Sequence, residues 1–411
     1  MKILLWFRRD LRVHDQILIH EANRSENTFL AFAQADLNAR FKNTGEKRWG
    51  ERKKKFYLES ILNLKSSLEE NGIPLWFSDR PLSNAIEQLE EQFIPDEIWC
   101  QQTAGWEEKE EIDFLAKHFK IKVFESQSLY HPDDLPFRLE AIPFGFTDFK
   151  KKVEKYASIR ECYNSSIEFN GAQNIEAPKL PSPPMLETEE FSAFPFAGGE
   201  CAGLERLESW IWKGNHLLTY KETRNQLIGT DYSSKFSPYL AWGCLSPRKI
   251  YWEIKKYEKK VISNQSTYWL YFELLWRDFF HFVCRNENAS FFKYGQNELL
   301  SMDMDFLSWA KGIGQNAFIN ANMIELAKTG FMSNRGRQNV ASFLVHNVKK
   351  HWALGAQHFE SELIDFEPAN NYGNWTYLAG IGHDPRKQRI FNPDLQKQRY
   401  DAEGKYVELW N

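Results

Sequence analysis

Short apolar runs alternate with amphipathic stretches along the first 125 residues of the chain. Five runs rich in β-forming residues predict strands over 3–7, 28–33, 73–78, 97–101 and 121–125. Between the second and third runs, apolar residues recur at helical spacing from Phe56 to Leu68, and Gly72 ends this predicted helix. Strands that alternate with helices indicate a doubly wound, Rossmann-like parallel sheet, so we expect an α/β domain over 1–126. No GxGxxG motif follows the first strand, which argues against an ordinary dinucleotide site.

The strand pattern stops after residue 126. We expect an interdomain connector over 127–200, because its later part is rich in proline and acidic residues. From Cys201 onward helical spacing dominates, so residues 201–411 are expected to form an all-α domain. Its helices are predicted over 203–214, 246–261, 266–283, 317–330 and 337–355. The third of these is apolar nearly all round and should be central and buried.

Composition narrows the class of protein. The 411 residues suffice for two or three domains, and the net charge of -4 does not indicate a nucleic-acid binder. Two basic stretches, 331–352 and 386–399, could follow a phosphate backbone or could be solvated faces that acids balance elsewhere. Aromatic residues reach 15%, with 15 Trp. A large core explains many of these rings, and the surplus suggests a flat cofactor, stacked bases or both.

The cysteines and the apolar runs bear on the compartment. Five cysteines without a CxxC pair argue against a disulfide framework or a zinc site and favour a reducing compartment. The apolar run at the N-terminus is too short for a signal peptide, and no later run reaches the length of a membrane span. We therefore expect a cytoplasmic protein without a membrane segment.

Two polar clusters stand at or in predicted helices. The serines of 233–237 precede a helical run, where hydroxyl and free N–H groups could bind a phosphate or could simply cap the helix. Glu273, Trp276 and Arg277 interrupt an apolar helix. Glu273 and Arg277 are four residues apart and could form an ion pair; alternatively, the glutamate could read a base edge while the tryptophan stacks on the base.

Two further clusters follow. The stretch 334–339 offers amide and guanidinium donors to anionic groups. Asp365, Glu367, Asn370 and Asn371 could hydrogen-bond a polar ring edge, which Gly373 would let the backbone approach closely. Each cluster alone has an ordinary structural explanation, such as a cap or a surface ion pair, but all four occur together.

Six ordered segments resemble the photolyase/cryptochrome family, most closely its cryptochrome DASH branch. They are "WFRRDLRVHD" (6–15), "YKETRN" (220–225), "DYSSKFSPYLAWGCLSPR" (231–248), "FELLWRDFF" (272–280), "GFMSNRGRQNVASFL" (330–344) and "NYGNWTYLAGIG" (371–382). The resemblance is nearly continuous from Tyr220 to about Trp410. It implies light-dependent repair of cyclobutane pyrimidine dimers by electron transfer from excited, reduced FAD.

The resemblance implies that the helical domain binds FAD in a U shape. Asn371 would face flavin N5, Arg337 would pair with the Asp365 carboxylate, and Glu367 stands where other photolyases have Asp. The stretch 312–321 also departs from the family pattern, with Asn320 where an Asp is common. The implied FAD contacts are Tyr220, Ser233, Ser234, Lys235, Phe236, Ser237, Arg337, Asp365, Phe366, Glu367 and Asn371.

The resemblance also implies a chain of tryptophans that passes electrons to FAD. Trp375 matches its first member and Trp352 its second. The stretch 297–306, where a third is expected, has no Trp. Either Trp309 or Tyr294 takes its place, or the chain of tryptophans is shorter.

The implied substrate is DNA that carries a pyrimidine dimer. Tyr377 stands where duplex photolyases have a second dimer-contacting Trp, which agrees with a preference for single strands, since extruding the dimer from them costs least. We expect a monomer. The implied DNA contacts are Arg224, Glu273, Trp276, Arg277, Asn334, Arg335, Tyr377 and Gln396.

The N-terminal sheet resembles the family's antenna domain, which in many DASH proteins holds a folate such as methenyltetrahydrofolate. Glu107 and Glu108 are candidate contacts of that antenna. Two alternatives to repair stay open: a blue-light photoreceptor with the same fold, and a nucleotide-binding fold without a light role. The chain ends at Asn411 without the long tail that signalling members often carry, which favours repair.

Overall fold

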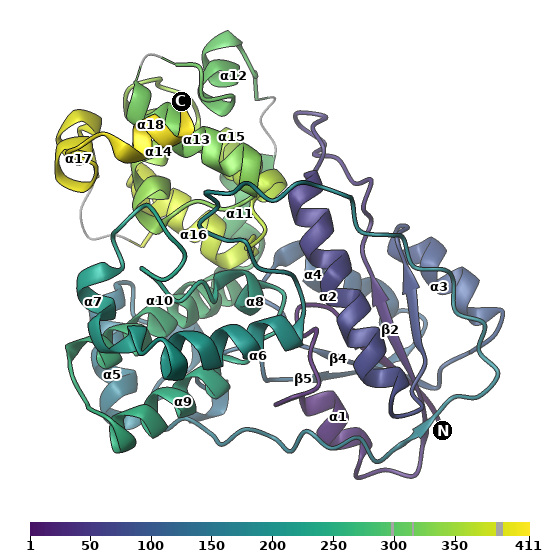
Figure 1. The fold of residues 1–411 in the computed structure, drawn as a ribbon. Coiled ribbons are helices and arrows are strands. Elements are labelled where there is room, and N and C mark those ends of the chain that lie inside the picture. The colour runs from purple at the N-terminus through teal and green to yellow at the C-terminus, as the bar shows by residue number, and fades with distance from the viewer. Residues whose placement is uncertain (297–299, 315, 384–388) are drawn as a thin grey trace.

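The computed structural model describes residues 1–296, 300–314, 316–383 and 389–411, with only the backbone of 293–296 (Figure 1). Its N-terminal part contains a parallel sheet whose strands run in the order β3-β2-β1-β4-β5. The strands are β1 (Lys2–Phe7), β2 (Thr28–Gln34), β3 (Leu75–Ser78), β4 (Glu97–Gln101) and β5 (Lys120–Phe124). All five predicted strands are confirmed to within two residues at each end.

Helices cover both faces of this sheet. Alternate residues of β1 point to opposite sides: Ile3 and Leu5 pack with α1 (Ile17–Ala22) and α2 (Glu51–Glu69), while Leu4 and Trp6 pack with α3 (Leu82–Glu90) and α4 (Trp106–Leu115). Gly72 adopts the positive φ of +74° just beyond α2, as expected of a residue that ends a helix. The doubly wound α/β architecture is therefore confirmed.

The stretch predicted to be a connector contains more regular structure than its sequence indicated. A short strand, β6 (Asn170–Gly171), adds to β2, and a helix, α5 (Phe146–Tyr156), packs on the helical part of the protein. The sequence analysis missed α5 because only Phe146, Phe149 and Val153 form its buried face among polar neighbours. Two short 3-10 helices, η1 (Pro132–Asp134) and η2 (Leu139–Ala141), precede α5, and Figure 1 shows the later part of the stretch running along the molecule mostly as an irregular trace.

The C-terminal half is helical. Its long central helix α10 contacts α5, α7, α9, α11 and α16, so the predicted central position is confirmed. The helices are α6 (Glu200–Glu208), α7 (Tyr220–Thr223), α8 (Ser237–Ala241), α9 (Pro247–Lys260), α10 (Gln265–Glu287), α11 (Ala289–Gln296), α12 (Met304–Ala310), α13 (Ala317–Thr329), α14 (Asn334–His346), α15 (Trp352–Glu362), α16 (Pro368–Ala379), α17 (Pro393–Tyr400) and α18 (Lys405–Trp410).

One helix prediction is wrong. The stretch 337–355 was expected to be continuous, but α14 ends at His346 and α15 begins at Trp352. Lys349 adopts a φ of +59° between them, and the His351 side chain accepts the N–H of Ala353 as the N-cap of α15. Helical spacing of apolar residues continues across this turn, so periodicity alone does not reveal it.

A buried ion pair and a hydrogen bond join the α/β part to the helical part. Arg248 of α9 lies 2.6 Å from the carboxylate of Asp15, which follows β1, and both side chains are almost fully buried. Arg9 donates 3.0 Å to the carbonyl of Phe366, which leads into α16. The α/β part thus fixes the segment on which the candidate site is built. Among the described residues, no helix has both the length and the apolar character needed to cross a membrane.

Candidate functional site

A cavity of about 480 Å³ opens among the helices of the C-terminal half. Its wall comes from α7, from the segment that leads into α8, and from α10, α14 and α16, which neighbour one another in Figure 1. Cavities of this size commonly hold cofactors. The proposed site residues in its wall are Tyr220, Arg224, Ser233, Ser234, Lys235, Phe236, Ser237, Glu273, Trp276, Arg277, Asn334, Arg337, Asp365, Phe366, Glu367, Asn371, Trp375 and Tyr377.

Three buried polar atoms in this wall have no hydrogen-bond partner within the described part of the chain. They are the Nζ of Lys235, the hydroxyl oxygen of Tyr232 and the Oδ1 of Asp365. Buried polar atoms without partners cost stability, so such a group points to a ligand that satisfies it. A cation, a phenol and a carboxylate oxygen together suit a ligand with an anionic group and with N–H donors, which FAD has.

Lys235 is the most unusual member of the wall. Its backbone has a φ of +61°, a region that side-chain-bearing residues rarely adopt. Its Nζ lies 3.3 Å from the ring centre of Tyr232 and 4.8 Å from that of Phe331. Burial lowers the pKa of Lys235 well below its usual value, and Glu325 opposes this. A bound phosphate would favour the ammonium form.

The serines around Lys235 do not cap α8. The N-cap of this helix is Phe236, and no side chain caps it. Ser234 accepts only a long bond of 3.5 Å from the N–H of Phe236. The alternative of simple N-capping is therefore wrong, and the hydroxyl groups of 233–237 remain available to a ligand.

An arginine–carboxylate pair crosses one end of the cavity. Arg337 of α14 donates from Nη2 to Asp365 at 2.8 Å, and its Nε donates to the carbonyl of Met332 at 2.9 Å. The Asp365 side chain is only 1% exposed, while that of Arg337 is 25% exposed. The second carboxylate oxygen of Asp365 remains on the cavity side without a partner from the described residues.

The segment that opens α16 supplies two polar groups. Glu367 is the N-cap of α16 and accepts the N–H of Ala369 at 3.3 Å and of Asn370 at 2.8 Å. Its carboxylate therefore supports the helix as well as facing the cavity. Asn371 donates 2.9 Å from its Nδ2 to the carbonyl of Ala356, which leaves its Oδ1 as the acceptor.

The expectation for Gly373 is wrong. We expected it to let the backbone approach a ligand ring. Instead, a Cβ at this position would lie 2.4 Å from the Phe280 ring, so the missing side chain allows α16 to pack closely on α10.

A second group of residues forms the part of the wall around α10. Glu273 forms an ion pair with Arg224 and accepts 3.2 Å from the indole N–H of Trp269. Arg277 instead donates to the carbonyl of Gln127 at 2.9 Å. The i,i+4 ion pair between Glu273 and Arg277 is thus not formed. Burial raises the pKa of Glu273, and Arg224 opposes this.

Trp276 is packed on one face. The ring of Phe146 stacks on it with a centroid distance of 3.7 Å and an interplanar angle of 10°. Tyr377 meets it edge-on, at 5.7 Å and 80°. Arg389, which sequence reasoning missed, lies over the Tyr377 ring at 4.4 Å and hydrogen-bonds its hydroxyl. Arg389 belongs to the basic stretch 386–399, which indicated a possible phosphate contact, but no family motif singled it out as a site residue.

Three proposed site residues do not line the cavity. Arg335 lies over the Tyr400 ring at 4.7 Å and contacts Asn225, because its position on α14 turns it toward α17. Gln396 belongs to α17, and Trp352 is buried at the start of α15 beside Tyr372. Arg335 and Gln396 are therefore not part of the cavity wall, and their role as DNA contacts stays a prediction.

The tryptophans lie together in one apolar cluster. Trp375 lines the cavity, and Trp309 of α12 meets it edge-on with ring centres 6.4 Å apart. Trp352 belongs to the same cluster. Trp309 is thus beside the first proposed member of the chain of tryptophans. Residues 297–299 and the Tyr294 side chain lie outside the described residues.

Three residues that the sequence singled out, Asn320, Glu107 and Glu108, lie outside the cavity wall. Asn320 donates 2.8 Å to the carbonyl of Gly314 and does not line the cavity. Glu108 pairs with Arg9 and Glu107 pairs with Arg48 at 2.6 Å, so both candidate antenna contacts lie in ion pairs. Residues 386–388 of the second basic stretch lie outside the described part of the chain.

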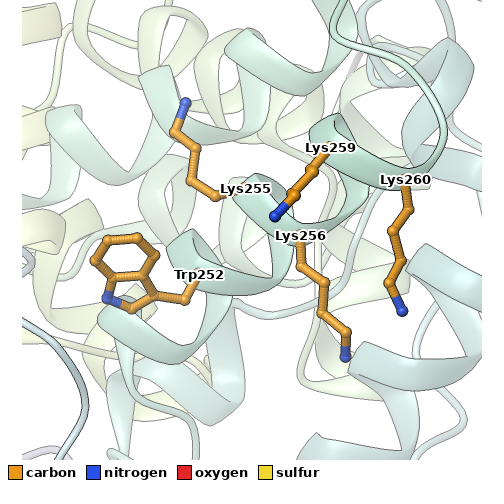
Figure 2. Close-up of a pocket in the computed structure, with 5 residues that line it drawn as sticks. All are labelled: Trp252, Lys255, Lys256, Lys259 and Lys260. Carbon is orange, nitrogen blue, oxygen red and sulfur yellow. The ribbon is translucent and has the colours of Figure 1, made fainter.

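A second hollow lies on the surface of α9 (Figure 2). Trp252 and four lysines line it, and their side chains spread apart rather than converge. Lys255 pairs with Glu258 at 2.8 Å and Lys256 with Glu253 at 3.4 Å. This surface is a solvated charged face, and none of the proposed site residues belongs to it.

Comparison with known proteins agrees with this arrangement. Residues 3–169 match the family model for DNA photolyase, and residues 269–411 match the model for the FAD binding domain of DNA photolyase. FAD is the cofactor of that domain, and the unpartnered atoms of the cavity wall fit it. The helical half of the chain is therefore a FAD-binding domain.

Full-length relatives and solved structures give the same result. The chain is 41% identical to a Synechocystis cryptochrome DASH over 99% of its own length and 87% of the relative's. It is 39% identical to a Xenopus laevis cryptochrome DASH, over 99% and 82%. The crystal structure of a Synechocystis cryptochrome superimposes with a TM-score of 0.92 at 40% identity, covering 100% of this chain and 88% of that one. A class III photolyase from Agrobacterium tumefaciens superimposes with a TM-score of 0.80 at 25% identity, over 100% and 86%. The chain therefore belongs to the photolyase/cryptochrome family and is similar to its cryptochrome DASH members.

Proposed function

We propose that this protein repairs cyclobutane pyrimidine dimers in single-stranded DNA when illuminated, with reduced FAD as its cofactor. One observation carries the proposal: Trp276 and Glu273, which suit a nucleobase, line the same cavity as Asp365 and Asn371, which suit a flavin. A substrate and a cofactor bound in one cavity can exchange an electron without a protein nucleophile. Bound FAD, reduced and excited by light, supplies the electron that opens the cyclobutane ring and recovers it afterwards.

The chain's own residues bind and orient the cofactor. Asp365, held by Arg337, presents a carboxylate oxygen to the N–H edge of a flavin, and Asn371 presents its Oδ1 to N5. Lys235 and the serines of 233–237 suit the phosphates. Trp375 and Trp352 are proposed to carry electrons inward to the cofactor.

The substrate side of the cavity supports a preference for single strands. Phe146 covers one face of Trp276, which leaves Trp276 at most one face for a base, and Trp276 lines the cavity. Tyr377 stands edge-on and adds no second parallel platform. Extracting a dimer from a duplex costs roughly a few kcal/mol of stacking and pairing, and least from a single strand. A site with one stacking face offsets less of that cost, so single strands are the better substrate.

Charge and assembly fit the same substrate. Four arginines line the cavity, namely Arg224, Arg277, Arg337 and Arg389, and they suit a polyanion.

One chain forms the whole wall, so a monomer suffices. All five cysteines are free, in keeping with the reducing cytoplasm that we propose as its location.

The proposal is tested first in the dark, by binding. Fluorescence anisotropy with single-stranded oligothymidylate compares a strand carrying one cyclobutane dimer with an undamaged strand. The proposal expects the dimer strand to bind more tightly, and the dimer duplex to bind more weakly than the dimer strand. Equal affinity for damaged and undamaged strands would contradict a lesion-binding role and favour the photoreceptor alternative.

A first prediction concerns Lys235 and pH. Burial lowers the pKa of Lys235 in the FAD-free protein, and an anionic phosphate nearby raises it again, so FAD binding should take up as much as about one proton. The affinity for FAD should then fall as pH rises through the window between the lowered pKa and the usual value of 10.5.

Isothermal titration calorimetry of FAD at pH 8.5, in two buffers of different ionisation enthalpy, measures this uptake. Lys235→Met should bind FAD without it, because the titrating group is gone. Uptake that persists unchanged in Lys235→Met would assign the proton to another group.

A further inference from the structure

The connector places a pair of aromatic residues next to Trp276, which lines the cavity, because one of the two stacks on it. Phe146, the first residue of α5, is buried and stacks on Trp276 at 3.7 Å. Phe144 stands two residues earlier, and 62% of its surface is exposed. Only Gly145 separates them along the chain, so the exposed ring lies two residues from the ring that packs on Trp276.

The exposed ring is held in place. His383, which follows α16, shares a 2.8 Å hydrogen bond between its Nδ1 and the carbonyl of Phe144. The two rings also pack together, with centres 4.7 Å apart and an interplanar angle of 35°. The Nε2 of His383 lies 2.5 Å from the carboxylate of Glu287, the last residue of α10. Phe144 is thus fixed to both α10 and the end of α16 while its outer face remains open.

The protonation of His383 favours this arrangement. Burial by itself would lower the pKa of His383, but the Glu287 carboxylate and the Phe144 carbonyl outweigh it and raise that pKa. The imidazolium form donates from both nitrogens at once, one to each partner. The side chain therefore connects Phe144 to Glu287 most firmly when it is charged.

The surroundings suit a strand of nucleic acid. A large exposed aromatic ring that the protein holds rigidly gains little from its own fold, and it often marks a binding surface. Lys151 and Lys152 are exposed further along α5, the helix that begins at Phe146, and offer positive charge to a phosphate backbone. Aromatic rings on which bases stack, together with positive charge for the backbone, are the combination used to bind single strands.

We propose that Phe144 is a stacking platform for the nucleobase next to the crosslinked pyrimidine pair, in the same single strand. The proposal rests on the proposed function and names a second contact for its substrate. Trp276 would receive the dimer and Phe144 the neighbouring base. The connector, which carries both Phe144 and Phe146, would then belong to the DNA-binding site.

Dark binding of modified oligonucleotides tests the platform. The probes are single-stranded oligothymidylates that carry one cyclobutane dimer, either with thymines on both sides or with abasic residues on both sides. The unaltered protein should bind the thymine-flanked strand about five- to a hundredfold more tightly, from the stacking of one base. Phe144→Ala should lose this preference and bind both probes like the abasic one, whereas Phe144→Tyr should keep it.

Controls separate the platform from the rest of the site. Phe191, another exposed phenylalanine of the connector, is 53% exposed, and Phe191→Ala should leave the preference unchanged. The FAD content of Phe144→Ala reports that it is folded. A flanking-base preference that survives in Phe144→Ala overturns the platform alone. Failure of the unaltered protein to prefer a dimer strand over an undamaged one overturns the proposed function, and the platform with it.

Discussion

Replacing Arg337 with alanine should empty the cavity of FAD and destabilise the helical domain. The substitution leaves the carboxylate of Asp365, whose side chain is 1% exposed, without its partner. Breaking a buried pair in this way costs about 3–5 kcal/mol, and we expect the lower end because Arg337 is a quarter exposed. Urea unfolding of the FAD-free protein measures the loss, and the flavin absorbance of purified protein measures the FAD content.

Two variants control this result. Arg337→Lys keeps the charge but loses the bond from Nε to the carbonyl of Met332. Its stability and FAD content should therefore lie between those of the unaltered protein and those of Arg337→Ala. Arg285→Ala breaks an arginine–carboxylate pair with Glu125 outside the cavity, and it should destabilise the protein without loss of FAD. Full FAD content in Arg337→Ala would show that the Asp365 end of the cavity does not hold the cofactor.

The second large effect is expected from Trp276→Ala. This change removes the stacking face for the dimer and leaves Phe146 without its partner. Base–aromatic stacking contributes about 1–3 kcal/mol per base, so the affinity for a dimer strand should fall about five- to 150-fold. Repair at substrate concentrations below the dissociation constant should fall by at least the same factor.

The FAD content of Trp276→Ala should stay normal, since the proposed cofactor contacts lie elsewhere in the wall. Trp276→Phe should recover part of the affinity, because a smaller ring still stacks. Trp252→Ala removes a tryptophan of α9 outside the cavity, shown in Figure 2, and should leave binding unchanged. Binding and repair that survive in Trp276→Ala would remove this ring from the substrate site.

The fold was largely predictable from hydrophobic periodicity. The strand runs from 3–7 to 121–125 are short, apolar and bounded by polar segments, and each forms a strand of the sheet. Periodicity failed where local backbone geometry decides the outcome. The turn at Lys349 divides one expected helix into two, and α5 forms because α10 buries three of its residues.

The site was predictable only through the ordered motifs. Lys235 and Asp365 are 130 positions apart, and no spacing rule brings them together; the resemblance to a family did so. The same resemblance gives Arg335 and Gln396 as DNA contacts, and neither lines the cavity. Arg335 lies over the Tyr400 ring of α17 instead, and a motif match does not encode that packing. Phe144 and Phe146 lie outside the six quoted motifs, so only the structure reveals that Phe146 stacks on Trp276 and that Phe144 packs on His383.

Light-driven repair by pre-reduced protein tests the central claim most directly. The flavin is reduced with dithionite beforehand, so that Trp375 and Trp352 are not needed, and the protein is illuminated with dimer-bearing oligothymidylate as a single strand or as a duplex with oligoadenylate. The account predicts loss of the dimer from the single strand, slower loss from the duplex, and at least fivefold slower loss from the single strand in Trp276→Ala at low substrate concentration. Intact dimers after illumination, with reduced FAD still bound, would contradict it and leave a blue-light photoreceptor as the better account.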